Sequence, residues 1–248
     1  MSVNLDLLLV VLNVSEENIN LFTVRHSKKA KRLIFNPSIR HGFEIILPRF
    51  YDDNWVLETV RKSKFTIEKR LAEIKEARRG LRPTLITLPP IGKSWKVTYR
   101  GINHKDSDEV VIETSTTLEV PEKALDVFWA PMVLQKWLHK KALQYLPNHL
   151  DNVSSKLTQS YSRVAVKKQK TRWGSCSIKR NINLNRNLML MPFECIDYVL
   201  HHEVVHLKVL NHSSKFWKEL GGSFPNYKKS LAQLKYIERK KLPEWALV

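Results

Sequence analysis

The spacing of apolar residues along the chain predicts strands first and a helix next. Between residues 20 and 50, the segments FTVRH, KRLIF and GFEIILP are short and rich in β-branched or aromatic residues, with polar turns between them, which is typical of β-structure. From Val56 to Ile74, apolar residues then recur at helical spacing. Asp52 or Asp53 is the expected N-cap of this helix, and Gly80 lies near its end.

Strand signals return after Pro83, in TLITL, KSWKVTYR and TTLEVP. A second helix is expected from Pro121, with an interruption at Pro147, because proline removes a backbone hydrogen bond within a helix. RVAVKKQKTRWGSCS and NINLN then read as two adjacent strands. The apolar run from Leu7 to Leu12 is too short to span a bilayer, and we expect it to form a buried strand.

Helices dominate the end of the sequence. Pro192 is suited to the first position of a long helix that reaches about Leu210, and two shorter helices are expected near residues 213–220 and 226–240. Strands therefore come first and helices last, which favours an α+β fold with segregated layers over a doubly wound sheet. We expect a β-rich N-terminal region with one long helix over residues 1–122 and a catalytic region over residues 123–248.

The composition adds few constraints on the kind of protein. Of the 248 residues, 43% are hydrophobic and 27% are charged, which is ordinary for a globular protein. Two cysteines, Cys176 and Cys195, cannot form a disulfide framework and suit a reducing compartment. Because the N-terminus lacks the basic segment of a secretion signal, we expect a cytoplasmic protein without a membrane segment.

The most informative stretch is HHEVVHLKVLNH, residues 201–212, which holds four histidines and one glutamate. His202 and His206 are four residues apart, so on a helix they share one face and both reach a single Zn²⁺ ion. Glu203 is displaced by about 100° around the helix, where its carboxylate reaches a water molecule at the metal. This is the H-E-x-x-H pattern, in which the glutamate is a general base.

A third protein ligand is needed for a catalytic zinc site, and His212 is the first candidate. A continuous helix would place it about 15 Å beyond His202, so the helix must end and the chain must turn back. Asn211 is suited to the left-handed conformation that ends a helix, and Ser213 is suited to cap the next one. Glu219, from the following helix, is the alternative third ligand.

These motifs resemble a known family. KTRWGSCS, NINLN, DYVLHHEVVH and NHSSKFW are similar to segments of the YgjP-like family of predicted metal-dependent hydrolases, which is related to the SprT-like zincins. The resemblance implies a zincin-like catalytic core with an N-terminal β-rich extension. It also implies zinc as the cofactor, His202, His206 and His212 as its ligands, and Glu203 as the base of a metallopeptidase that cleaves peptide bonds.

The segment RWGSCS has two interpretations. In zincins a strand beside the active-site helix binds extended substrate as an additional strand, which makes Trp173, Gly174 and Ser175 candidate substrate-binding residues. Alternatively, Trp173 belongs to the core and Gly174 marks a close approach or a bulge. The sequence leaves both interpretations open.

The formal net charge of +18 is unusual, and the excess of basic residues flanks the catalytic segment. Residues 1–100 hold 19 Lys and Arg against 10 Asp and Glu, and residues 161–248 hold 17 against 6. Such charge suits contact with nucleic acid, which is the alternative function: a peptidase that acts on DNA-bound proteins, or a binding protein with a structural zinc. The oligomeric state cannot be read from the sequence.

Overall fold

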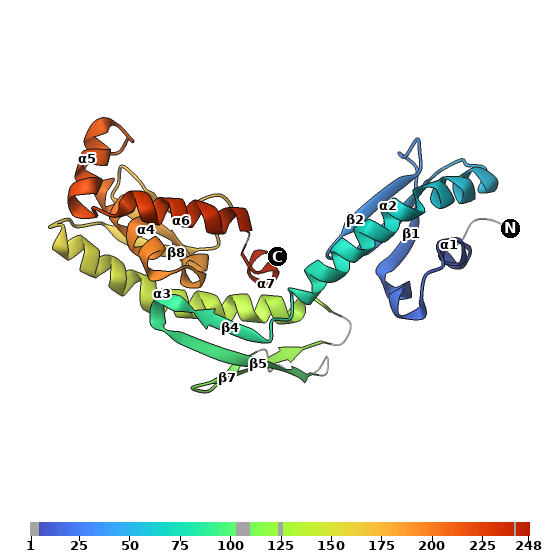
Figure 1. Ribbon diagram of the computed structural model, residues 1–248, viewed down its shortest axis with the longest axis horizontal. Coiled ribbons are helices and arrows are strands. Elements are labelled where there is room, and N and C mark those ends of the chain that lie inside the picture. Colours follow the sequence, from blue (N-terminus) through green and yellow to red (C-terminus); the bar gives the residue numbers. More distant parts are fainter. Residues whose placement is uncertain (1–4, 103–109, 124–125, 241) are drawn as a thin grey trace. The chain divides into compact units, whose positions relative to one another are not determined.

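The computed structural model describes residues 5–102, 110–123, 126–240 and 242–248, and the chain forms two compact units, Met1–Arg82 and Pro83–Val248 (Figure 1). This boundary differs from the expected one after residue 122. The strands between Pro83 and Glu122 belong to the second unit because their buried side chains join the same hydrophobic core as the long helix that follows them. The mixed α/β architecture agrees with the α+β class expected from the sequence.

The first unit is a small sheet covered by helices. Its elements are α1 (Leu5–Leu12), the 3₁₀-helix η1 (Glu16–Leu21), β1 (Phe22–Ser27), β2 (Ile34–Ser38), β3 (Gly42–Pro48) and α2 (Asp53–Arg79). Strand β3 lies in the middle, parallel to β1 and antiparallel to β2. The three strands predicted between residues 20 and 50 are therefore present.

Helix α2 is the long helix that the apolar spacing predicts. The Asp52 carboxylate accepts a hydrogen bond of 2.8 Å from the Trp55 N–H, which confirms the expected N-cap. By contrast, the run from Leu7 to Leu12 lies in helix α1, so the expected strand is wrong. Short apolar runs do not distinguish a buried strand from a buried helix. Here Leu8 and Leu12 are buried one helical turn apart, in the same core as α2.

The second unit carries all the candidate site residues. Its elements are β4 (Leu85–Leu88), η2 (Pro89–Ile91), β5 (Lys93–Gly101), β6 (Ile112–Glu113), β7 (Thr117–Glu122), α3 (Trp129–Lys156), β8 (Arg163–Lys167), β9 (Gly174–Cys176), β10 (Asn181–Asn185), η3 (Arg186–Leu190), α4 (Phe193–Val205), α5 (Ser214–Ser223), α6 (Tyr227–Lys240) and α7 (Glu244–Leu247). Two sheets flank α3, one of order β4-β5-β7-β6 and one of order β8-β10-β9 (Figure 1).

Helix α3 corrects two expectations. It starts at Trp129 rather than near Pro121, which lies in β7, and it continues through Pro147 to Lys156. A proline inside a helix costs about 3 kcal/mol. Leu146 and Leu150, on either side of the proline, are fully buried, so core packing offsets that cost.

Strand β9 is the element that borders the site. It pairs antiparallel with β10, which in turn pairs parallel with β8. The segment RVAVKKQKTRWGSCS, expected as one strand beside NINLN, therefore forms two strands that lie on opposite sides of β10. The arrangement leaves β9 at the edge of its sheet, next to helix α4. Among the described residues, no helix is long and apolar enough to cross a membrane.

Candidate metal and catalytic centre

Helix α4 places two histidines and a glutamate on adjacent turns. Pro192, the expected first residue of the helix, is its N-cap, so the helix begins one residue later, at Phe193, and Cys195, Ile196 and Leu200 are fully buried on its core face. The helix ends at Val205, not near Leu210, and His206 is its C-cap. His202 and His206 therefore lie one turn apart, as their spacing predicts.

The chain turns back just after His206. The Val209 N–H donates to the Val205 carbonyl over 3.0 Å, and the Leu207 N–H donates to Val204 over 3.0 Å, which tightens the last turn. Asn211 does not take the expected left-handed conformation. Its side-chain oxygen instead accepts a hydrogen bond of 3.2 Å from Ser213, which is the N-cap of α5 as expected. This turn brings His212 back to the helix.

The three histidine rings converge through their Nε2 atoms. The Nε2 of His202 lies 3.1 Å from that of His206 and 3.0 Å from that of His212. Metal–nitrogen bonds of about 2.0–2.1 Å in a tetrahedral site separate neighbouring ligand atoms by about 3.3 Å, close to these values. Among the described residues, these three side chains form the one group of potential metal ligands with its donor atoms this close together.

The hydrogen bonds of the rings also suit a cation at their centre. The Nδ1 of His206 lies 2.9 Å from the carbonyl of Val209, and since a carbonyl only accepts, Nδ1 carries the proton and Nε2 carries the lone pair. Burial and the two neighbouring imidazoles lower the pKa of His202 to about 3, so its ring is neutral. Neutral rings with converging lone pairs are the form of histidine that metals bind.

Phe216, on α5, packs against all three rings. Its ring is fully buried, and its centroid lies 4.8 Å from His202, 4.5 Å from His206 and 4.8 Å from His212. Phe216 was not among the residues expected at the site. Its position four residues after His212 was the available signal, because a helix that starts at Ser214 turns that side chain back towards the histidines.

Glu203 lies beside the histidines with its carboxylate buried. The residue is 4% exposed, and its Oε2 atom has no hydrogen-bond partner among the residues that the structure describes. Burial raises the pKa of Glu203 to about 8, although the nearby Arg172 guanidinium lowers it. Burying a carboxylate oxygen without a hydrogen-bond partner costs free energy. Groups buried at such a cost, with a shifted pKa, are typical of functional sites.

Gly174, at the start of β9, explains how the carboxylate is held. A Cβ atom at this position would lie 2.6 Å from Glu203 Oε1 and 2.7 Å from Glu203 Cγ, so only glycine allows this approach. The structure therefore agrees with the interpretation of Gly174 as a position where another group approaches the backbone closely. No local pattern indicated Glu203 as the partner of Gly174, because the contact joins positions 29 residues apart.

The main chain of β9 offers hydrogen-bonding groups at the sheet edge. The Trp173 carbonyl accepts from Asn185 and the Ser177 N–H donates to Asn181, both towards β10. Because main-chain groups alternate in direction along a strand, those of Gly174 and Cys176 point to the other side, away from β10. This is the side on which an additional strand would pair.

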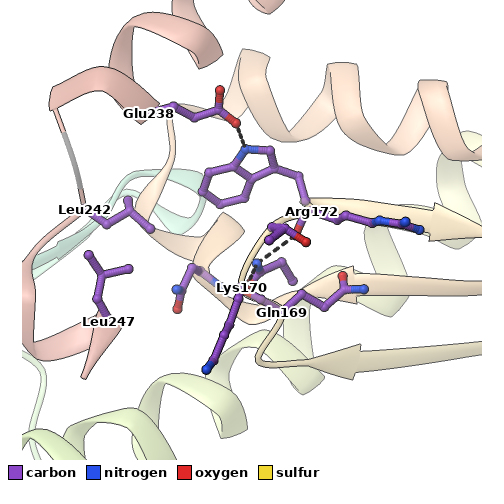
Figure 2. A pocket seen from close by; sticks show the side chains of 10 residues that line it. Gln169, Lys170, Arg172, Glu238, Leu242 and Leu247 are labelled. Carbon is purple, nitrogen blue, oxygen red and sulfur yellow. Dashed lines mark hydrogen bonds between the residues drawn. The ribbon is translucent and has the colours of Figure 1, made fainter.

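Trp173 separates two hollows near the centre. One, of about 280 Å³, is lined by His202, Glu203 and apolar residues of α4 and α6. The other, of about 300 Å³, is lined by residues 169–173 and by Leu242 and Leu247. The Trp173 indole N–H donates to the Glu238 carboxylate of α6, and both residues line both hollows. Figure 2 shows the second hollow, with Glu238, Leu242 and Leu247 around it.

Other candidates from the sequence lie apart from the histidine cluster. The Glu219 carboxylate pairs with Lys208 at 3.4 Å. His201 is buried, with its Nδ1 2.8 Å from the Asp197 carbonyl. Cys195 is fully buried in the core. Burial raises the pKa of the Cys176 thiol to about 11, so it is not an activated nucleophile.

Comparisons with known proteins place this site in a family. The chain is similar to crystal structures of two metallopeptidase zymogens: Pyrococcus abyssi abylysin, with 26% identity over 37% of this chain and 92% of abylysin, and Methanocaldococcus jannaschii jannalysin, with 25% identity over 39% and 97%, both with TM-scores of 0.34. No curated protein matches the chain. The YgjP-like metallopeptidase domain matches residues 31–237, and the chain therefore belongs to this family of metal-dependent peptidases.

Proposed function

We propose that this metallopeptidase uses zinc bound by His202, His206 and His212, and that Glu203 is the general base. One observation carries the proposal: three imidazole Nε2 atoms converge beside a buried carboxylate oxygen for which the described part of the chain offers no hydrogen-bond partner. In the described part of the chain the group contains three protein ligands, whereas a structural zinc site needs four. This count supports a catalytic site over a structural one.

Zinc is the metal that the donor set favours. Imidazole nitrogen suits zinc, while magnesium and calcium prefer oxygen ligands. When bound in such a site, zinc acts as a Lewis acid towards a carbonyl and lowers the pKa of water. Each of the three rings offers a nitrogen lone pair to the metal. The carbonyl of Val209 fixes the tautomer of His206 that leaves its Nε2 atom able to bind the metal.

Glu203 moves the proton during hydrolysis. Its carboxylate takes a proton from the water that attacks the peptide carbonyl, and the new C–O bond forms on the carbonyl carbon. The carboxyl group then gives this proton to the amide nitrogen as the C–N bond breaks, which releases a carboxylic acid and an amine. The hollow that holds His202 and Glu203 is lined by apolar residues of α4 and α6 together with the charged side chains of Arg172, Lys235 and Glu238.

Substrate binding is assigned to the free edge of β9. An extended peptide that pairs with the outward N–H and C=O groups of Gly174 lies beside Glu203, because this glycine contacts the carboxylate. The Trp173 ring lines the same hollow as the catalytic residues. The main chain of Ser175 is directed to β10, so we assign direct substrate contact to Trp173 and Gly174 alone.

The test is Glu203→Gln, which keeps the shape of the side chain but removes the group that accepts the proton. We expect turnover of an unfolded protein substrate to fall by about 10²–10⁴-fold, the range for general acid–base catalysis, while one zinc per chain is retained. Glu194→Gln, an exposed position in the first turn of the same helix, is the matched control and keeps full turnover. Undiminished turnover of Glu203→Gln would exclude the proposed base.

Nucleic-acid contact and a cytoplasmic location stay predictions from the sequence. Contact with DNA depends on the net charge of +18, and the cytoplasmic location depends on the cysteine count and the N-terminal sequence.

A further inference from the structure

Helix α4 does not explain how the third histidine, His212, is held in place. His202 and His206 are held by the backbone of α4 and its neighbourhood, whereas His212 lies in the loop before α5 and is exposed to solvent. A loop side chain on the surface is mobile unless specific contacts restrain it. For His212 to bind a metal with the other two rings, something must hold its main chain in place.

Trp217 supplies the main-chain contact. Its indole Nε1–H donates a hydrogen bond of 3.1 Å to the carbonyl oxygen of His212, five residues earlier. In the part of the chain that the structure describes, this is the one hydrogen bond to the main chain of His212. The bond fixes the orientation of the peptide group next to the ligand, and therefore the direction in which the ring leaves the backbone.

Trp217 is itself held on two sides. Its ring stacks on Tyr227, the first residue of α6, with centroids 5.7 Å apart and planes 24° apart. Its other ring contacts are with Phe216, at 5.2 Å and nearly perpendicular, with His212, at 5.8 Å and 32°, and with His202, at 6.4 Å and 68°. A chain of contacts thus runs from α6 through Tyr227 and Trp217 to the third histidine.

We infer that Trp217 is a positioning residue for the metal site, and that its indole N–H orders the loop so that His212 meets the other two ligands. The inference rests on the proposed ligand set. Since the His212 residue is exposed, water replaces the indole donor when the N–H is removed, and the folded protein loses little stability. The affinity for zinc falls instead, because the loop must then be ordered when the metal binds.

The experiment compares two variants that each remove one indole N–H. Trp217→Phe removes the donor to His212 and keeps an aromatic ring against Tyr227. Trp137→Phe is the matched control, since the Trp137 Nε1–H also donates a hydrogen bond, of 2.9 Å, to the Glu113 carboxylate in the same unit. Metal-free proteins are titrated with zinc against a chelating dye, at a temperature at which every variant is fully folded.

We expect Trp217→Phe to bind zinc about tenfold more weakly, at the lower end of the range for outer partners of metal ligands. Trp137→Phe binds as the wild type does. In cobalt-substituted protein, Trp217→Phe also weakens the visible absorption that marks four-coordinate cobalt, which a general loss of stability would not change at a temperature where the protein is folded.

Two outcomes separate the inference from the proposed function. If Trp217→Phe binds zinc as tightly as the wild type while His212→Ala binds it weakly, the inference is overturned and the ligand set stands. If His212→Ala itself binds zinc as the wild type does, the ligand set is wrong and the inference falls with it.

Discussion

The two halves of the histidine cluster are built in different ways. His202, Glu203 and His206 come from three positions of one helix, and their spacing alone sets their geometry. His212 comes from an exposed loop, and its place depends on α5 and α6 through Phe216, Trp217 and Tyr227. The helical half is therefore encoded locally, and the loop half is encoded by tertiary contacts.

This difference determines what each half contributes. In the helical half, Glu203 and His206 are buried and His202 is half-buried, so the Glu203 Oε2 atom is kept away from bulk water. The loop half is exposed, so it gives the cluster a side open to solvent and substrate. A catalytic metal site needs both properties, a rigid set of ligands and an accessible coordination position.

The largest effect is expected in the helical half. His202 Nε2 is the atom within 3.1 Å of both other donors, so His202→Ala removes the centre of the cluster. We expect zinc affinity to fall by more than about a hundredfold, beyond the range for changes around the ligands. Its neighbour provides the control: His201→Ala lowers the unfolding temperature, because the ring is buried, but keeps the zinc. Equal zinc content in both variants, by elemental analysis, would contradict the assignment.

The next effect tests the loop half. His212→Ala is expected to lower zinc affinity by more than about tenfold, because it removes a ligand rather than an outer partner. Glu219→Ala, the alternative third ligand, removes an exposed ion pair with Lys208 that is worth about 0–1 kcal/mol, and leaves the affinity unchanged. A reversed order of the two affinities would assign the third ligand to Glu219.

A smaller effect concerns the contact between β9 and the helical half. In Gly174→Ala the new Cβ displaces the Glu203 carboxylate, and we expect a loss in kcat of about a hundredfold, the cost of a 1 Å misplacement, with zinc affinity unchanged. Gly222→Ala, where a Cβ meets no atom within 4 Å, is the control and keeps full activity. Loss of zinc along with activity would show that Gly174 supports the ligands instead of the base.

The same contrast shows how far the sequence could predict the site. The spacing of His202 and His206 was sufficient to predict that their side chains share one face of a helix. The prediction that this helix ends before His212 correctly placed His212 close to them. The expected cause of that break was wrong. The Asn211 side chain accepts a hydrogen bond from the Ser213 N–H, and helix α4 already ends at Val205. The contact between Gly174 and Glu203 and the anchoring by Trp217 join separate elements, so no local pattern indicated them.

For the fold, sequence patterns predicted a helix correctly where the capping residue and the apolar spacing agree. They failed where packing in the core determines the secondary structure. Asp52 and the apolar stripe of α2 identified that helix correctly. The break expected at Pro147 did not occur, because buried leucines on both sides keep α3 continuous. The run from Leu7 to Leu12 was assigned as a strand because six apolar residues without clear periodicity fit either structure.

The most direct test of the account is a crystal structure of the zinc-loaded protein with anomalous data at the zinc edge. We predict a single anomalous peak about 2.0–2.1 Å from the Nε2 atoms of His202, His206 and His212, with Glu203 outside the set of bonded atoms. A peak bound by Glu219 or Glu203 in place of His212, or no peak among the three rings, would contradict the central claim.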